Sequence, residues 1–387
     1  MTKISEKQLQ YALYALIAIG VLITGYALLS NNFQIGTAAG GTPTPSAPVV
    51  QKAKLVLTLI TVPECRYCTD LKDLIARIKS AGDVQIISEK TVSYRDAADL
   101  LSKYQITKVP TILLSGETDK VTDLKNLWLQ IGEEKPDGTL VLTKFRPMYF
   151  DIDKGDFVGK LKVTRIINST CGELCTKAFV IQNNFEITTG IRFVEEQERE
   201  FNTTQGRELV QKYNITKIPA LVITGDVQAY DELGLSNAWK NVGTAEKDGA
   251  LVWRRIQPPY QELPSGKMKG LATLIGILDR NCNECYDLEV HARILGKAGV
   301  NFKNITYYNN TQAKAQSLIE KYNITLLPTV LVDGEMDEYY PFTSLKQIWE
   351  QIGTVEEDGW HVFRNMSSLG SNVTYKVIAT NETKKTE

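Results

Sequence analysis

A repeat of about 110 residues occurs three times in this 387-residue chain. The copies of the segment Lys-Tyr-x-Ile-Thr-x-x-Pro are 109 residues apart and end at Pro110, Pro219 and Pro328. A tryptophan, an Ile-Gly or Val-Gly pair and an Asp-Gly pair follow in every copy. This period is too long for a solenoid unit and has the size of a small domain. The sequence predicts tandem domains at 54–158, 159–269 and 270–387, the last with a polar C-terminal tail.

Within each copy, the apolar residues indicate alternating strands and helices. The first element is an apolar, β-rich run, at 54–62, 161–167 and 271–278. An amphipathic helix, a short strand and a second helix ending in Lys-Tyr come next. After the proline we expect a strand, a turn, a second strand, a helix carrying the tryptophan as a core residue, and a last strand after Asp-Gly. The predicted order is βαβαββα with one extra strand, which is an α/β fold.

The six cysteines fall into three pairs, one at the same place in every copy. The pairs are Cys65 and Cys68, Cys171 and Cys175, and Cys282 and Cys285. A cysteine that follows a strand and opens a helix lies against free backbone N–H groups, which favour the thiolate. A second cysteine one turn later can attack a mixed disulfide and release the partner. The spacing favours thiol–disulfide exchange, and static structural disulfides are the alternative.

The proline of the repeated segment stands directly before a strand, 45 to 48 residues after the first cysteine. We expect a cis peptide bond between it and the residue before it, which is Val109, Ile218 or Leu327. Such a bond would hold the preceding backbone open beside the sulfurs, where a substrate chain could pair with it. The three prolines and the residues before them are therefore candidate substrate-binding residues.

These features resemble the thioredoxin-like superfamily, which includes thioredoxins, glutaredoxins and protein disulfide isomerases. The resemblance covers roughly residues 54–380 and rests on the strand-Cys-x-x-Cys-helix and Lys-Tyr-x-Ile-Thr-x-x-Pro motifs. It implies that Cys65 and Cys282 are nucleophiles, that Cys68 and Cys285 resolve the mixed disulfide, and that the three prolines are cis. The oxidised pairs would be Cys65–Cys68, Cys171–Cys175 and Cys282–Cys285.

The cysteine pairs also depart from that family. No tryptophan precedes a first cysteine, and no pair encloses Gly-Pro or Gly-His. The second pair has three intervening residues instead of two. Beside Cys65, Arg66 adds a positive charge that Glu64 partly cancels, so we expect Cys65 to have the lowest thiol pKa. The acid that thioredoxins bury six residues before the first cysteine is replaced by Leu59, Arg165 and Gly276.

The N-terminal segment predicts a membrane anchor. No charged residue occurs between Lys7 and Lys52, and residues 11–29 are all apolar or small. As a helix this stretch nearly spans a hydrocarbon core of roughly 30 Å. Lys3 and Lys7 precede it, so we expect a cytoplasmic N-terminus (1–10), a transmembrane signal anchor (11–30) and an extracytoplasmic remainder after a Gly/Pro/Thr-rich tether (31–53). A cleaved signal peptide, with a small-residue site at 37–39, and a pilin-like assembly helix are the alternatives.

Sequons provide a second sign of export. Chance predicts about three Asn-x-Ser/Thr sequences in this chain, which contains nine. The excess suggests N-glycosylation on an external surface; the alternative is that threonine is common after asparagine in the turns of this protein. The candidate sites are Asn168, Asn202, Asn214, Asn304, Asn309, Asn323, Asn365, Asn372 and Asn381.

Charge and composition narrow the function. The 44 basic and 45 acidic residues leave a net charge of −1, which argues against a nucleic-acid partner. With two histidines and cysteine pairs in separate copies, we expect no metal site, and we expect no cofactor. The sequence predicts a membrane-anchored thiol–disulfide oxidoreductase or isomerase that acts on exported proteins. The alternative is a non-catalytic, glycosylated surface or scaffold protein of thioredoxin-like domains with structural disulfides.

Overall fold

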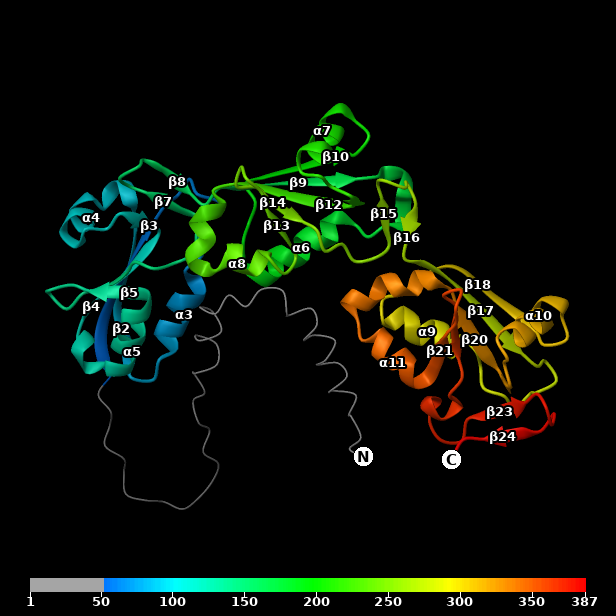
Figure 1. Cartoon of the computed structure of the whole chain (residues 1–387). Coiled ribbons are helices and arrows are strands. Elements are labelled where there is room, and N and C mark those ends of the chain that lie inside the picture. The colour runs from blue at the N-terminus through cyan, green and yellow to red at the C-terminus, as the bar shows by residue number, and fades with distance from the viewer. Residues whose placement is uncertain (1–51) are drawn as a thin grey trace, which may run out of the picture.

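The computed structural model describes residues 52–387 and contains three domains of the same architecture, which follow one another along the chain (Figure 1). Each is built on a five-stranded sheet. The sheet orders are β2-β1-β4-β6-β5, β10-β9-β12-β14-β13 and β18-β17-β20-β22-β21. The first strand of each domain pairs in parallel with the second and antiparallel with the strand after the repeated proline. The predicted threefold α/β repeat is confirmed.

The elements of the three domains correspond one to one. The first domain contains β1 Ala53–Thr61, α3 Lys72–Ser80, β2 Val84–Ser93, α4 Ala98–Tyr104, β3 Lys108–Val109, β4 Thr111–Gly116, α5 Thr122–Ile131, β5 Gly132–Glu134, β6 Leu140–Leu142, β7 Tyr149–Asp151 and β8 Asp156–Val158. The second contains β9 Leu161–Ile167, α6 Ala178–Thr189, β10 Glu195–Glu200, α7 Thr204–Lys212, β11 Lys217–Ile218, β12 Ala220–Gly225, α8 Leu235–Trp239, β13 Gly243–Ala245, β14 Leu251–Trp253, β15 Tyr260–Glu262 and β16 Met268–Lys269. The third contains β17 Leu271–Leu278, α9 Glu289–Lys297, β18 Asn301–Asn309, α10 Ala313–Lys321, β19 Leu326–Leu327, β20 Thr329–Val332, α11 Leu345–Ile352, β21 Gly353–Val355, β22 His361–Phe363, β23 Thr374–Val377 and β24 Thr383–Lys385.

The predicted order of elements is wrong after the repeated proline, and it also lacks the short strand before the proline and the two strands that end each domain. No strand separates the strand after the proline from the helix that carries the tryptophan in the described part of the chain; a 3-10 turn leads directly into that helix. The second strand comes after the helix and begins at the repeated glycine. A Cβ on these glycines would lie 2.0 to 2.3 Å from a carbonyl oxygen of the neighbouring strand, so the close approach of that strand requires glycine. The glycines are Gly132, Gly243 and Gly353.

Several repeated residues serve the fold. The three tryptophans are 1 to 2% exposed, which confirms them as core residues. The tyrosine of Lys-Tyr donates a hydrogen bond to the aspartate of Asp-Gly in every domain, at 3.0, 3.1 and 2.8 Å. This contact ties the end of the second helix to the hairpin turn between the last two strands of the sheet. The bonded pairs are Tyr104 and Asp137, Tyr213 and Asp248, and Tyr322 and Asp358.

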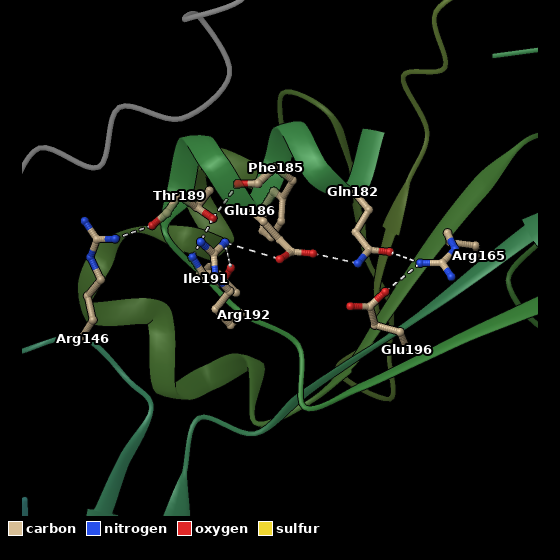
Figure 2. A network of polar contacts seen from close by, with 9 residues as sticks. All are labelled: Arg146, Arg165, Gln182, Phe185, Glu186, Thr189, Ile191, Arg192 and Glu196. Atoms are coloured by element: carbon tan, nitrogen blue, oxygen red, sulfur yellow. Dashed lines mark hydrogen bonds and ion pairs between the residues drawn. The ribbon is translucent and has the colours of Figure 1, made fainter. Parts of the chain in front are cut away.

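The domains are joined in the same way at both boundaries. Gly159 and Gly270 open the second and third domains with φ angles of 92° and 78°, which glycine adopts without strain. The carbonyl of each accepts a hydrogen bond from a buried tyrosine of the domain that it opens, Tyr230 at 2.8 Å and Tyr339 at 2.6 Å. At the first boundary, Arg146 also donates to the carbonyl at the end of α6 (Figure 2).

The two ends of the chain differ in what the structure describes. The predicted cytoplasmic segment, anchor and most of the tether lie outside the described residues. Within 52–387, no helix has the length and apolar character needed to cross a bilayer. The polar C-terminal segment of the third domain packs on that domain, because β24 pairs with β23 and Thr386 is buried.

Candidate redox sites

The three cysteine pairs lie between the first strand and the first α-helix of each domain, and Cys171 of the second pair is within a short 3-10 segment. All three are disulfide-bonded, with Cα–Cα distances of 5.5, 5.7 and 5.4 Å. The helix does not open at the cysteines as expected. In the first and third domains it begins four residues after the second cysteine, at Lys72 and Glu289. The backbone N–H groups of that helix therefore do not surround the first sulfur, and thiolate stabilisation must come from other groups.

The peptide bonds before Pro110, Pro219 and Pro328 are cis, as predicted. The residues before them are buried and belong to β3, β11 and β19. Each of these short strands pairs antiparallel with a strand from the end of its own domain. We call β7, β15 and β23 the closing strands.

The register shows which backbone groups the closing strands use. In the first domain Val109 lies opposite Phe150, and the Ile152 N–H donates to the Thr107 carbonyl at 2.8 Å. Opposed residues of antiparallel strands alternate between hydrogen-bonded and non-hydrogen-bonded pairs. Val109, two residues from Thr107, therefore exchanges its backbone hydrogen bonds with Phe150. The same register pairs Ile218 with Gln261 and Leu327 with Lys376.

The closing strands also reach the cystine loops. In each domain, the residue after the second cysteine donates its backbone N–H to a carbonyl at the start of the closing segment. This carbonyl belongs to the residue two positions before Phe150, Gln261 or Lys376. The contacts are Thr69 to Met148 at 3.0 Å, Thr176 to Pro259 at 2.9 Å and Tyr286 to Thr374 at 3.0 Å. The open backbone edge expected beside the sulfurs is thus absent from residues 52–387, because the chain's own strand covers it in each domain.

The first pair is half-buried among charged groups. Arg66 lies 5.3 Å from the Tyr67 ring centroid, next to Cys65. Glu64 pairs with Arg95 at 2.7 Å and accepts a hydrogen bond from Tyr94 at 3.0 Å. Its pKa is lowered by a hydrogen bond to its own backbone and by these two side chains. Because Arg95 compensates Glu64, the positive charge of Arg66 is left to act on the cysteines.

The second pair is covered. Cys171 is 8% exposed, and Met268 of β16 places its Sδ atom 3.5 Å from Cys171 Sγ and 3.9 Å from Cys175 Sγ. The bonded sulfurs carry no proton, so these are packing contacts. Asn168, three residues before Cys171, donates to Gln261 of the closing strand at 2.7 Å. This arrangement shields the disulfide from an attacking thiolate.

We expect Met268→Ala to raise the rate at which dithiothreitol reduces Cys171–Cys175 by about tenfold, because exchange requires access to a sulfur. Timed alkylation followed by peptide mass spectrometry measures the rate. Cys65–Cys68 in the same molecules is the control and keeps its rate. An unchanged rate at the second pair would show that Met268 is not what protects it.

The third pair adjoins a pocket of about 340 Å³. Cys282, Cys285 and Pro328 line it together, so the cystine and the cis-proline meet at one cavity. Tyr286, which also lines the pocket, donates its hydroxyl proton to the Pro328 carbonyl at 2.8 Å. The same hydroxyl lies 3.0 Å from His291 Nε2, so neutral His291 donates to it. Burial raises the pKa of Tyr286 and lowers that of His291 to about 4.

Sequence reasoning missed several of these groups. Met268 comes close to the second disulfide only through tertiary packing. Tyr286 and His291 stand one and six residues after Cys285, but their contact with each other and with the Pro328 carbonyl appears only in the folded domain. Asp279 could have been noticed, because it stands three residues before Cys282. Its carboxylate pairs with Lys376 of the closing strand at 2.5 Å, with 3% and 13% of the two side chains exposed.

The position six residues before the first cysteine carries no acid in any domain. In the second domain Arg165 stands there, and its charge is compensated (Figure 2). It donates to the buried amide of Gln182 at 2.5 Å and pairs with Glu196 at 2.9 Å and Glu198 at 3.2 Å. Among residues 52–387, no group of three or more His, Cys, Asp or Glu side chains is placed to hold a metal ion.

The sequons differ in their surroundings. Seven of the nine asparagines are exposed, whereas Asn168 and Asn309 are half-buried. The Asn168 amide is bonded to Gln261 beside the second disulfide, which leaves it engaged in the fold. Four others have left-handed backbone, a conformation for which asparagine is favoured. These are Asn214, Asn323, Asn372 and Asn381.

Comparisons with known proteins give low similarity throughout. No family model and no curated protein matches the chain. Similar solved structures include the alkylhydroperoxide reductase protein AhpF of Enterococcus faecalis (14% identity, 56% of this chain and 90% of that one, TM-score 0.16) and human ERp44 (11%, 79% and 88%, 0.15). A protein disulfide oxidoreductase from Aeropyrum pernix is another (11%, 62% and 95%, 0.14). On the grounds of its own three sheets, cystine loops and cis-prolines, the chain consists of three tandem thioredoxin-like domains.

Proposed function

We propose that the chain is a membrane-anchored, extracytoplasmic thiol–disulfide oxidoreductase that acts on exported proteins, and that Cys282–Cys285 is its main reacting pair. One observation carries the choice of pair: both cysteines and cis-Pro328 line the same pocket. Cys65–Cys68, half-buried and beside Arg66, is a second reacting pair. Cys171–Cys175, covered by Met268, is a structural disulfide.

In the reductive direction, the Cys282 thiolate attacks a substrate disulfide. The substrate S–S bond breaks, a Cys282–substrate disulfide forms, and the released substrate thiolate takes a proton from water. Cys285 then attacks the Cys282 sulfur, which restores Cys282–Cys285 and releases the second substrate thiol. A dithiol reductant returns the pair to its reduced form. The reverse sequence oxidises a substrate dithiol.

The closing strand decides how a protein substrate can approach the third pair. Leu327 is already paired with Lys376, so an extended substrate chain cannot add to that edge while β23 is in place. We therefore assign substrates that present a disulfide on a protruding loop, with one sulfur entering the pocket. The uncharged stretch at 11–29, with lysines only on its N-terminal side, supports the anchor and the orientation.

Insulin reduction and refolding of scrambled ribonuclease test this function with the purified full-length chain in mild detergent. We expect insulin reduction by dithiothreitol to be faster with the protein than without it, and native ribonuclease to be recovered sooner. The absence of activity in both assays, with disulfides that resist mild reductant, would contradict the proposal.

A non-enzymatic scaffold is the second candidate. The closing strands favour it, because they cover the same backbone edge in all three domains. In a scaffold, the three disulfides would stay oxidised and serve only to hold the cystine loops. Dithiothreitol treatment followed by alkylation and peptide mass spectrometry separates the two candidates. In an oxidoreductase, mild reductant opens Cys282–Cys285, whereas in a scaffold all six cysteines stay protected at the same reductant concentration.

A further inference from the structure

The three domains differ at one pair of positions next to the disulfide. One position lies three residues before the first cysteine, and the other is the closing-strand residue opposite the residue before the cis-proline. In the first domain both side chains belong to one apolar cluster. In the second they form a neutral hydrogen bond of 2.7 Å, and in the third an ion pair of 2.5 Å. The pairs are Val62 and Phe150, Asn168 and Gln261, and Asp279 and Lys376.

The ion pair of the third domain lies against the reacting groups. The Asp279 carbonyl accepts the Cys282 N–H at 3.0 Å, and Asp279 lines the pocket together with both cysteines. Lys376 lies opposite Leu327. Leu327 directly precedes cis-Pro328, which lines the same pocket. The hydrogen bond from Lys376 lowers the pKa of Asp279, so this carboxyl group is ionised at neutral pH.

Other charged and titratable groups face the same pocket. Arg280, two residues before Cys282, lines it, and the segment that leads into α9 carries further acids and a tyrosine. Glu284 stands between the cysteines in the sequence but does not line the pocket. Opposite them, β18 contributes a second tyrosine. The additional groups that line the pocket are Tyr286, Asp287, Glu289 and Tyr307. Of all these charges, those of Asp279 and Lys376 are the ones withdrawn from water, where screening by salt is weakest.

We propose that the Asp279–Lys376 pair keeps the reactivity of Cys282 close to that of an uncharged site, because each charge acts on the thiol and the two charges compensate each other. This proposal rests on the function proposed above. The ammonium stabilises the Cys282 thiolate and the carboxylate destabilises it, so each residue alone would shift the thiol pKa in the opposite direction. Both are positioning residues, because neither exchanges bonds with the substrate.

Single and double substitutions in the full-length chain test the proposal. We expect Asp279→Asn to lower the pH midpoint of Cys282 alkylation by about one unit and Lys376→Gln to raise it by about one unit. At a pH below both midpoints, one unit is a tenfold change in thiolate fraction. The double variant recreates the Asn168–Gln261 pair of the second domain and is expected to return close to the wild-type midpoint.

The measurement is site-resolved and does not depend on substrate turnover. The reduced chain is treated with iodoacetamide from pH 4 to 10, and mass spectrometry reports the alkylation rate of each cysteine. The Cys65 midpoint is the internal control and stays unchanged. Lys376→Arg keeps the positive charge and is expected to keep the wild-type midpoint. It provides a second variant at this position if Lys376→Gln does not fold.

The outcomes decide the proposal separately from the proposed function. Shifts of the two single variants in the same direction, or no shift, would overturn it, since a purely structural pair would loosen the site in one direction only. If the two single variants shift the Cys282 midpoint in opposite directions but the protein does not reduce insulin, the charge-pair proposal stands and the proposed oxidoreductase function is contradicted.

Discussion

Replacing Cys282 by serine is expected to lower the rate of insulin reduction by about tenfold or more, because a serine hydroxyl is not ionised near neutral pH and cannot form the mixed disulfide. The assay is dithiothreitol-driven insulin reduction by the full-length chain. The third pair carries this prediction because its sulfurs share a pocket with the cis-proline. Circular dichroism of each variant checks that the fold is retained.

The other two domains supply matched controls for this variant. Cys65→Ser and Cys171→Ser remove a cysteine at the same place in the same fold. We expect each to change the rate by less than about threefold. A larger loss with Cys65→Ser than with Cys282→Ser would move the main site to the first domain, where Arg66 lies beside the cysteines. Equal and small losses in all three variants would favour the scaffold.

Acidification from pH 6.5 to 4 is expected to lower the free energy of unfolding of the third domain by up to about 3 kcal/mol through His291 alone. This side chain is buried, with 6% exposed, and burial lowers its pKa from 6.5 to about 4. Between these values the unfolded chain binds a proton that the folded domain does not, so stability is complete above pH 6.5 and is lost as the pH falls. The ring packs on Phe363 at 4.4 Å and donates to Tyr286.

Hydrogen exchange can follow this effect within the intact chain. Protection of the central strand β17 reports the third domain, and β1 and β9 report domains that contain no histidine. His291→Phe removes the titration while keeping a ring of similar size, and we expect it to flatten the pH dependence of β17 between pH 4 and 6.5. His361, also buried, is present in both proteins and cancels. The same pH dependence with and without His291 would contradict the prediction.

The consequence for the site is a link between stability and substrate access. Tyr286 donates a hydrogen bond to the Pro328 carbonyl at the pocket and accepts one from His291. Protonation of His291 would leave a charge among Phe363 and Tyr286, in an apolar interior that cannot compensate it. The pocket of the third domain is therefore expected to persist best above pH 6.5.

Local sequence patterns predicted much of the scaffold. The first strands agree with the apolar runs to within a residue, because these inner strands of the sheet bury or half-bury most of their side chains and are therefore mostly apolar. The tryptophans and the cis-prolines were predictable from repetition at the same spacing. The placement of β5, β13 and β21 after the tryptophan helix was not predictable. A short run between two turns has no periodicity that shows whether the strand comes before or after that helix.

Three equivalent domains, each with one cysteine pair and one proline at a set distance, could be inferred from the amino-acid sequence alone, because these are short-range patterns repeated at a domain-sized period. The differences between the three sites became visible only in the folded chain. Met268 covers the second disulfide from 97 residues beyond Cys171, and Lys376 reaches Asp279 across the same separation. Contacts of this range depend on how the closing strand returns over the cystine loop, and the charge, cover and cavity beside each disulfide depend on the side chains that it brings there.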